Sequence, residues 1–189
     1  RTRKARTGLA ESRRGRSAAQ VIANLSVAAL SVSSLTSNTL SRWMADCCVS
    51  PIAETWLAVT VKVMCAAALV EATADTVSSE VGQAFGGDPV LIVGFRRVTA
   101  GTDGAMTVLG SCAGIAAGAL VAVVGAWALD LSTSAVLTAL GAGVCGLFFD
   151  SLLGATVERR GWIGNDLVNF TSTLFAALLA AAVYRFCIL

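Results

Sequence analysis

The sequence predicts an all-α integral membrane protein, a polytopic bundle with about five membrane-spanning helices. The mean hydropathy of the 189 residues is +0.74 and only 14% of them are charged, a composition that is not typical of a water-soluble domain. The uncharged stretches are also long. Residues 17–41 and 104–129 carry no charge over 25 and 26 positions, and about 20 apolar residues are enough to cross a bilayer.

The chain is expected to form a single transmembrane helical domain, residues 17–189, behind a basic lead-in, residues 1–16. No repeat or linker indicates a second domain. The lead-in holds seven of the fourteen basic residues and suits an anionic membrane surface, either as an amphipathic segment or as coil. Because the chain opens within this basic run and without a starting Met, we expect that an N-terminal portion is missing or processed away.

The second expected span, residues 55–85, is long enough to project beyond the bilayer. A loop should precede it, because Pro51 stops a helix that crosses it. Lys62 interrupts the span and either snorkels to the surface or pairs with a carboxylate. Glycines and a proline end the helix, and an apolar re-entrant segment or a short loop strand follows at residues 90–94. The later spans are expected at residues 104–129, 135–156 and 166–186.

Basic residues predict which loops share one side of the membrane. If every span crosses, residues 1–16, 87–103 and 158–165 lie together and hold eleven of the fourteen basic residues. Such a bias follows the positive-inside rule.

Two polar stripes mark the end of the second span. Glu71, Asp75, Ser79 and Gly82 recur at helical spacing on one face. A second face beside it carries Thr73, Thr76, Glu80 and Gln83. Carboxylates at membrane depth are costly and by default indicate function. The alternative is that the helix has left the bilayer by Glu71 and that these charges are solvated.

Acidic residues from separate spans converge on the same predicted side. The second span ends there with Asp75 and Glu80, the fourth ends there with Asp150, and the fifth begins there at Asp166. Asp166 is alternatively a simple helix cap. This convergence predicts one active site at the membrane interface.

The turn Gly101-Thr102-Asp103-Gly104 is expected to open the third span. Its amides and the positive helix end suit phosphate, whereas the plainer interpretation is an ordinary N-cap. Asp103 would repel phosphate unless a cation lay between them, which points to Mg²⁺. Four arginines on that side either hold phosphates or only set the topology. They are Arg96, Arg97, Arg159 and Arg160.

Glycine, histidine and cysteine usage adds three expectations. Gly110, Gly114 and Gly118 recur at every fourth position, so another backbone should approach that face closely. Histidine is absent, which excludes imidazole bases and histidine-ligated zinc. The six cysteines show no metal-binding spacing and are expected to be small buried apolar thiols.

Several ordered motifs resemble one known family. They are ADTVSSEVGQAFG, VTAGTDGAMTVLGSCAG, GLFFDSLLGATVE and NDLVNFTST, together with the lead-in KARTGLAESRRGR and AAQVIAN. They look like the family of the human transmembrane protein 19 and plant phytyl-phosphate kinase, and more distantly like phosphatidate cytidylyltransferases and polyprenol kinases. The resemblance covers nearly the whole chain, although the earlier spans of that family are absent here, and its animal branch has no clear substrate.

The resemblance implies nucleotide-dependent transfer of phosphate to an isoprenoid monophosphate, in support of tocopherol synthesis in plastids. Our leading hypothesis is a Mg²⁺-dependent kinase that makes the diphosphate with CTP or ATP as donor. Asp75 and Asp150 would hold the metal. The catalytic candidates are Asp75, Glu80, Asp150 and Asp166, and the nucleotide or phosphate candidates are Gly101, Thr102, Asp103, Gly104, Arg96, Arg97, Ser79 and Asn169.

Two other classes of function stay open. A transporter would carry polar residues through the full bilayer depth, whereas here the acids crowd one side. A non-catalytic subunit would pack through its glycine face in a larger complex or oligomer. The expected partners are membrane lipid and a prenyl phosphate, without nucleic acid. The expected location is a multi-pass membrane position, in the plastid if the organism is photosynthetic.

Overall fold

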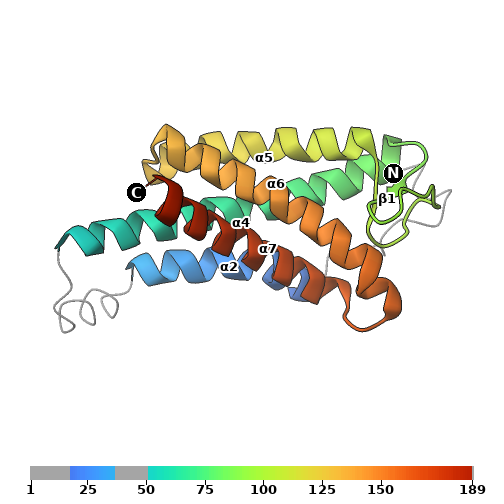
Figure 1. The fold of residues 1–189 in the computed structure, drawn as a ribbon, viewed down its shortest axis with the longest axis horizontal. Coiled ribbons are helices and arrows are strands. Elements are labelled where there is room, and N and C mark those ends of the chain that lie inside the picture. Colours follow the sequence, from blue (N-terminus) through green and yellow to red (C-terminus); the bar gives the residue numbers. More distant parts are fainter. Residues whose placement is uncertain (1–17, 37–50, 189) are drawn as a thin grey trace.

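The fold is organised around one long central helix, α4 (Pro51–Phe85), in a computed structural model that describes residues 18–36 and 51–188. The helices that contact α4 are α2 (Ala18–Thr36), α5 (Val108–Leu129), α6 (Thr133–Thr156) and α7 (Asn165–Val183). They run back and forth beside it as an antiparallel bundle (Figure 1). The predicted all-α class is confirmed.

The remaining elements are short. The strands β1 (Val90–Leu91) and β2 (Ala105–Met106) pair antiparallel in the segment between α4 and α5. A 3₁₀ turn, η1 (Glu158–Arg160), follows α6, and a π-helical turn, η2 (Tyr184–Ile188), follows α7. Of the two alternatives for residues 90–94, the loop strand is therefore correct.

Four helical segments in the described part of the chain are long and apolar enough to cross a membrane. They are Trp56–Phe85, Val108–Leu129, Thr133–Arg160 and Asn165–Phe186. The helix of the first predicted span is shorter in its apolar part, Val21–Ser33. The sequence prediction of a membrane bundle with about five helices is thus confirmed, with one helix shorter than the others.

Two helix starts differ from the sequence prediction. Pro51 does not lie in a loop before the second span but is the first residue of α4. Proline is tolerated there because backbone N–H groups in the first turn of a helix have no partner within the helix. The third span begins at Val108 rather than at Gly104. The side chain of Thr107 caps it by accepting a hydrogen bond of 3.0 Å from the backbone N–H of Gly110.

Glycines bring the backbones of α4 and α5 together. A Cβ atom added to Gly114 would lie 2.4 Å from the carbonyl oxygen of Ala74, and one added to Gly110 would lie 2.5 Å from that of Ser78. Both separations are too short for real atoms. The close approach predicted from the glycine spacing is confirmed, and the third glycine, Gly118, packs against Val70.

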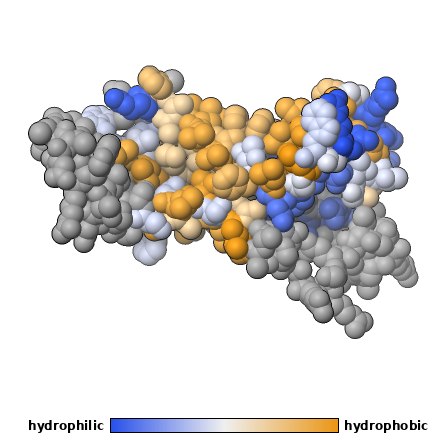
Figure 2. Space-filling view, turned by 90° about the horizontal axis from the view of Figure 1, so that it is seen from below, coloured by the Kyte–Doolittle hydropathy of each residue, from blue (hydrophilic) through white to orange (hydrophobic). Residues whose placement is uncertain are grey.

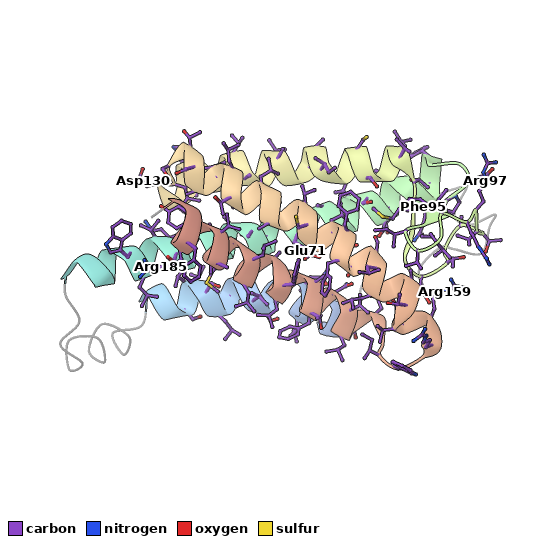
Figure 3. All side chains as sticks on the ribbon, in the orientation of Figure 1. Glu71, Phe95, Arg97, Asp130, Arg159 and Arg185 are labelled. Atoms are coloured by element: carbon purple, nitrogen blue, oxygen red, sulfur yellow. The ribbon has the colours of Figure 1, made fainter. Side chains whose placement is uncertain are left out.

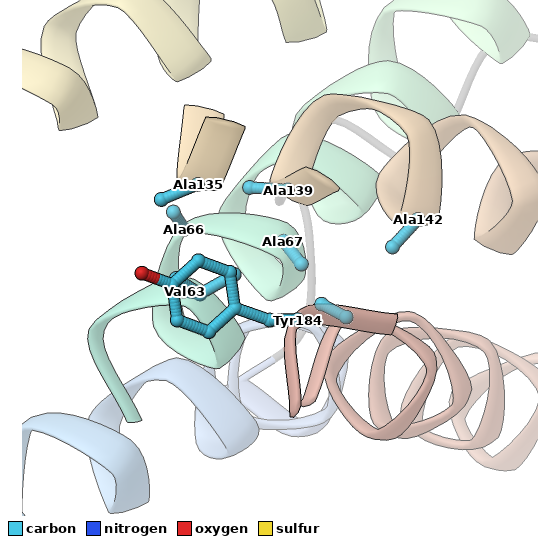
Figure 4. Close-up of a cluster of buried hydrophobic side chains, with 8 residues drawn as sticks. Val63, Ala66, Ala67, Ala135, Ala139, Ala142 and Tyr184 are labelled. Carbon is cyan, nitrogen blue, oxygen red and sulfur yellow. The ribbon is translucent and has the colours of Figure 1, made fainter. Parts of the chain in front are cut away.

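Alanine dominates the core at the end of the bundle away from the β1–β2 loop. Val63, Ala66 and Ala67 of α4 meet Ala135, Ala139 and Ala142 of α6 there, with Tyr184 beside them (Figure 4). Small side chains let helices approach each other, which favours packing where water is absent. A second cluster joins α2 to α4 and α7 through Val27, Ala28, Cys65, Ala68 and Ala177.

The outer surface separates by polarity along the bundle. Figure 2 shows hydrophobic residues across the middle of the visible face and hydrophilic residues gathered towards the ends, most densely at one of them.

Cys112 and Cys145 are exposed on α5 and α6, so the expectation of buried thiols is wrong for these two and correct for Cys65. Cys47 and Cys48 lie outside the described residues.

The loops before α5 and after α6 lie at the same end of the bundle. Figure 3 places Phe95, Arg97 and Arg159 at that end, with Asp130 and Arg185 at the other. Residues 87–103 and 158–165 therefore lie at the same end of the bundle, as the sequence predicts. The third basic segment, residues 1–16, lies outside the described residues.

Candidate functional site

A pocket of about 150 Å³ lies at the loop end of the bundle, where α4, the segment before α5 and the end of α6 meet. Most of its walls are polar side chains and loop backbone. The lining residues are Asp75, Ser78, Ser79, Gly82, Gln83, Pro89, Ala100, Gly101, Thr102, Asp103, Gly104, Ala105, Met106, Thr107, Leu147, Asp150, Ser151, Glu158 and Asn165.

Four carboxylates from four different segments face this pocket: Asp75 of α4, Asp103 of the loop, Asp150 of α6 and Glu158 of η1. The charge of Asp75 acts on both Asp150 and Glu158, and that of Asp103 acts on Glu158. No lysine or arginine is among the described residues that line the pocket. Like charges this close repel each other, so the site favours a cation or bound protons.

The loop that carries Asp103 lies directly on α6 because two glycines leave room for it. Gly104 has a φ of +71°, and a Cβ atom there would lie 2.1 Å from the backbone nitrogen of Ala155. On the other side of the contact, a Cβ atom on Gly154 would lie 2.7 Å from the nitrogen of Gly104. These contacts fix the loop beside the last turns of α6 and bring Asp103 to the same pocket as Asp150.

Thr102 holds the turn of this loop. Its hydroxyl donates a 2.7 Å hydrogen bond to the carbonyl oxygen of Thr99, and its own carbonyl accepts from the N–H of Ala105 at 3.0 Å. The Gly101 to Gly104 turn therefore precedes β2 and does not open a helix. The expectation that this turn opens a helix is wrong, because Thr107 caps α5 three residues later. Phosphate binding by the turn stays a prediction.

Behind the pocket, α7 supplies hydroxyl groups to the acidic residues. The hydroxyl of Ser172 donates to Asp150 Oδ2 at 3.0 Å, and that of Thr173 lies within hydrogen-bond distance of Glu71 Oε2. Glu71 is only 1% exposed and lies in the middle of the bundle (Figure 3). The rest of this stripe, Asp75, Ser79 and Gly82, lines the pocket, so the stripe faces into the protein and the alternative of a solvated Glu71 is wrong.

The pocket gathers seven of the residues that the sequence selects. They are Asp75, Ser79, Gly101, Thr102, Asp103, Gly104 and Asp150. Their chemical roles stay predictions. Each of the four segments that carry the carboxylates overlaps a motif named above, and Asn165 at the start of α7 also lines the pocket, so the convergence expected from topology is present in the structure.

The other selected residues lie outside the pocket lining. Glu80 and Asp166 are exposed. Gly164, without a side-chain bond, takes the N-cap position of α7, so Asp166 is not its cap. Arg97 lies 3.6 Å from Asp88 in an exposed ion pair, and Arg96 is exposed beside it.

Asn169 also lies outside the pocket lining, on the side of α7 that faces α2. Its amide donates a 2.9 Å hydrogen bond to Asn24 Oδ1. The bond joins α7 to α2. The structure therefore places Asn169 at a contact between helices.

Glu158 and Thr107 are pocket residues that the sequence analysis does not select. Glu158 follows Asp150 by eight residues, two turns of a helix, with Gly154 between them on the same face. Extending the helical periodicity across the end of α6 would have found it. Thr107 shows a weaker signal, a hydroxyl residue directly before a long apolar run, which is typical of an N-cap.

In the part of the chain that the structure describes, no three acidic, cysteine or histidine side chains are placed to hold a metal ion by themselves. This arrangement does not suit a closed metal site of protein ligands alone. Mg²⁺, however, usually takes one or two carboxylates and completes its shell with water and phosphate oxygens. The residues present fit that kind of ion.

Comparison with known proteins places the chain in a family. The model of the family described as "Integral membrane protein DUF92" matches residues 1–177. The chain belongs to this family. This match confirms the prediction from the sequence motifs that the chain belongs to a family of integral membrane proteins.

Relatives of this DUF92 chain occur in archaea, cyanobacteria and plants. An uncharacterized membrane protein of Methanocaldococcus jannaschii is 37% identical over 60% of this chain and 47% of its own length. One of Synechocystis is 34% identical over 58% of this chain and 43% of its own. The chloroplastic protein VTE6 of Arabidopsis thaliana is 30% identical over 59% of this chain and 34% of its own.

The DUF92 chain thus spans about half or less of the length of these curated relatives. No solved structure matches it.

Proposed function

We propose that the pocket is the active site of a phosphotransferase that converts an isoprenyl monophosphate, such as phytyl monophosphate, to its diphosphate at the membrane interface. The observation that carries the proposal is the set of four carboxylates that converge on one pocket at the end of a membrane bundle, without a basic side chain among its described lining residues. The resemblance to phytyl-phosphate kinases and the kinship with VTE6 support the choice of substrate.

The acidic pocket needs a counter-charge before two phosphate groups can meet in it. Asp75 and Asp150 approach from α4 and α6 and would hold Mg²⁺ between them and the phosphate oxygens. The ion would neutralise charge on the donor phosphates and on the transferred phosphoryl group. Asp103 and Glu158 lie on the loop side of the pocket and add to its attraction for cations.

The loop backbone supplies the groups that can contact phosphate directly. Gly101, Thr102 and Gly104 line the pocket with little side-chain bulk, so phosphate oxygens can approach their backbone. Ser79 adds a hydroxyl from α4. Arg96 and Arg97 lie outside the lining and would meet only those donor phosphates that project from the pocket.

The chemistry asks little of the side chains. A phosphate oxygen of the acceptor forms a bond to the terminal phosphorus of CTP or ATP, and the bond from that phosphorus to the bridging oxygen breaks, which releases CDP or ADP. The acceptor is already an anion near neutral pH, so no base has to remove a proton. Positioning and charge neutralisation dominate such a transfer, and a protein without histidine can supply both.

The acceptor chain would stay in the apolar environment of the bundle while its phosphate enters the pocket. The pocket lies at the end of four helices that are long and apolar enough to cross a bilayer, within the described residues. A lipid phosphate is anchored at this depth by its own chain. The arrangement therefore favours an amphiphilic acceptor over a water-soluble one.

The proposal is tested by incubating the purified chain in lipid nanodiscs with labelled CTP or ATP and phytyl or farnesyl monophosphate. We expect Mg²⁺-dependent formation of the diphosphate. Asp75→Asn and Asp150→Asn should abolish it, because each removes a charge from the pocket and keeps the side-chain volume. Asp166→Asn is the matched control, since Asp166 is acidic but exposed and outside the pocket. Equal loss in all three variants, or no loss in any, would refute the assignment.

A further inference from the structure

Glu71 is a buried acid that the proposed transfer does not use. It lies one helical turn before Asp75 on α4, it does not line the pocket, and only 1% of its surface is exposed. Its Cγ packs against Gly146 of α6, where an added Cβ atom would lie 2.6 Å away. Glu71 is thus enclosed between α4, α6 and α7.

The hydrogen bonds around Glu71 fit poorly with an ionised carboxylate. Oε1 has no hydrogen-bond partner, and Oε2 is bonded to the hydroxyl of Thr173. No described lysine or arginine forms an ion pair with it. The titratable groups that face it, Asp75 on its own helix and Asp150 on α6, are both acidic. A charge here would be buried, surrounded by like charge and bonded at one oxygen only.

The hydroxyl of Thr173 lies between two oxygen atoms that could each accept its proton. Its oxygen is within hydrogen-bond distance of Glu71 Oε2 and also lies 2.7 Å from the carbonyl oxygen of Asn169. A threonine hydroxyl has one proton to donate. If Thr173 gives that proton to the Asn169 carbonyl, which can only accept, then the contact with Glu71 needs a proton from the glutamic acid.

We propose that Glu71 is a protonated, neutral carboxylic acid that donates to Thr173 Oγ1 and acts as a positioning residue for the neighbouring pocket. The proton chain then runs from Glu71 to Thr173 and from Thr173 to the Asn169 carbonyl, and every bond has one donor and one acceptor. It ties α4 to α7. The hydroxyl of the adjacent residue of α7, Ser172, lies 3.0 Å from Asp150 Oδ2 and also 3.0 Å from the Asn169 carbonyl oxygen. The positioning role rests on the proposed function, whereas the protonation does not.

Three variants of the full chain in nanodiscs separate a neutral donor from a charge. Glu71→Gln keeps the length and supplies an N–H donor without charge, so we expect it to retain wild-type thermal stability and transfer rate. Glu71→Ala removes the donor to Thr173 Oγ1 and opens space against Gly146. The ratio of folded to unfolded protein should therefore fall by roughly tenfold or more. Glu80→Gln, on the exposed side of the same helix, is the matched control and should change neither property.

Infrared difference spectroscopy reads the proton directly. Wild-type protein should show the carbonyl stretch of a protonated carboxylic acid that Glu71→Gln lacks and Glu80→Gln retains. An identical band in wild type and Glu71→Gln would overturn the proposal. So would a Glu71→Gln variant as unstable as Glu71→Ala, or one that fails to fold, because a charge would then be required. If wild-type protein transfers no phosphate, the proposed function fails, and the spectra and stabilities still decide the state of Glu71.

Discussion

The two ends of the helix bundle use the same helices for different purposes. At the end away from the β1–β2 loop, α4 and α6 present alanine and valine to each other, and Tyr184 completes a cluster without a charged member. At the loop end, the same helices present Asp75 and Asp150 to a pocket of about 150 Å³. The first end maximises contact between helices, and the second leaves space that is lined with acids.

The difference shows that one pair of helices can combine close packing at one end with an open acidic pocket at the other. Close helix packing needs small residues, and these leave little space and few polar atoms. The proposed site for phosphate and metal needs open space and many polar atoms instead. Along α4 the change falls between Ala67 and Glu71, one helical turn. The glycine face of α5 packs against α4 from Val70 to Gly82, on the loop side of this change.

The largest loss of stability should come from a substitution in the glycine face of α5, where the backbones of α4 and α5 approach each other closely. Gly114→Leu would drive its side chain into the backbone of Ala74, so the free energy of unfolding should fall by about 3 kcal/mol or more. Gly141→Leu is the matched control, because an added Cβ atom at Gly141 meets no neighbour within 4 Å in the described structure. Thermal unfolding in detergent measures both. Equal stability of the two variants would contradict the packing described for α5.

A substitution at the alanine-rich end of the bundle should lower stability without changing the pocket at the other end. Ala139→Leu adds volume at a fully buried position, which typically costs about 1–3 kcal/mol. The protein that remains folded should bind Mg²⁺ as wild type does. Titration of the folded fraction after size-exclusion chromatography checks this. Loss of Mg²⁺ binding in the folded variant would show that the two ends are not separate.

The loop end should show the opposite behaviour. Gly104→Ala places a Cβ atom against the backbone of α6, so the loop must move and the transfer rate should fall by roughly tenfold. The free energy of unfolding should fall by about 1 kcal/mol or more, because alanine is strained at this positive φ. Gly87→Ala separates contact from backbone strain, because Gly87 has a similar φ of +74° with no neighbour within 4 Å of an added Cβ. A rate as low in Gly87→Ala would mean that strain alone explains the loss.

The smallest effects are expected at acids outside the pocket. Glu80→Gln and Asp166→Asn alter exposed side chains and should leave stability within about 0.5 kcal/mol of wild type, with unchanged transfer. Melting curves and initial rates measure both quantities. A strong loss of transfer in either variant would show that the site extends beyond the residues that line the pocket.

Sequence periodicity predicted the parts of this structure that repeat. The glycines of α5 and the inward stripe of α4 follow helical spacing, so their faces were predictable from the chain alone. Asp75 and Asp150 were also predictable, because acids are costly within apolar runs. The structure of the turn at Gly101 to Gly104 was not, since Gly104 serves a contact with α6 that no local pattern encodes.

Partners across the bundle were likewise beyond the sequence. Asn169 has the spacing of a site residue, yet its amide bonds to Asn24, 145 residues away in the chain. Glu158 lies past the end of α6 and reaches the pocket only because η1 continues the same face. Such placements depend on how helices pack, and one-dimensional patterns determine that only in part.

The central claim is that the pocket holds a divalent cation between Asp75 and Asp150. Electron paramagnetic resonance of Mn²⁺, used as a probe for the Mg²⁺ site, tests it most directly on purified protein in nanodiscs. We predict one saturable Mn²⁺ site in wild type, competed by Mg²⁺, that Asp150→Asn loses and Asp166→Asn keeps. Equal Mn²⁺ binding by wild type and Asp150→Asn would contradict the account.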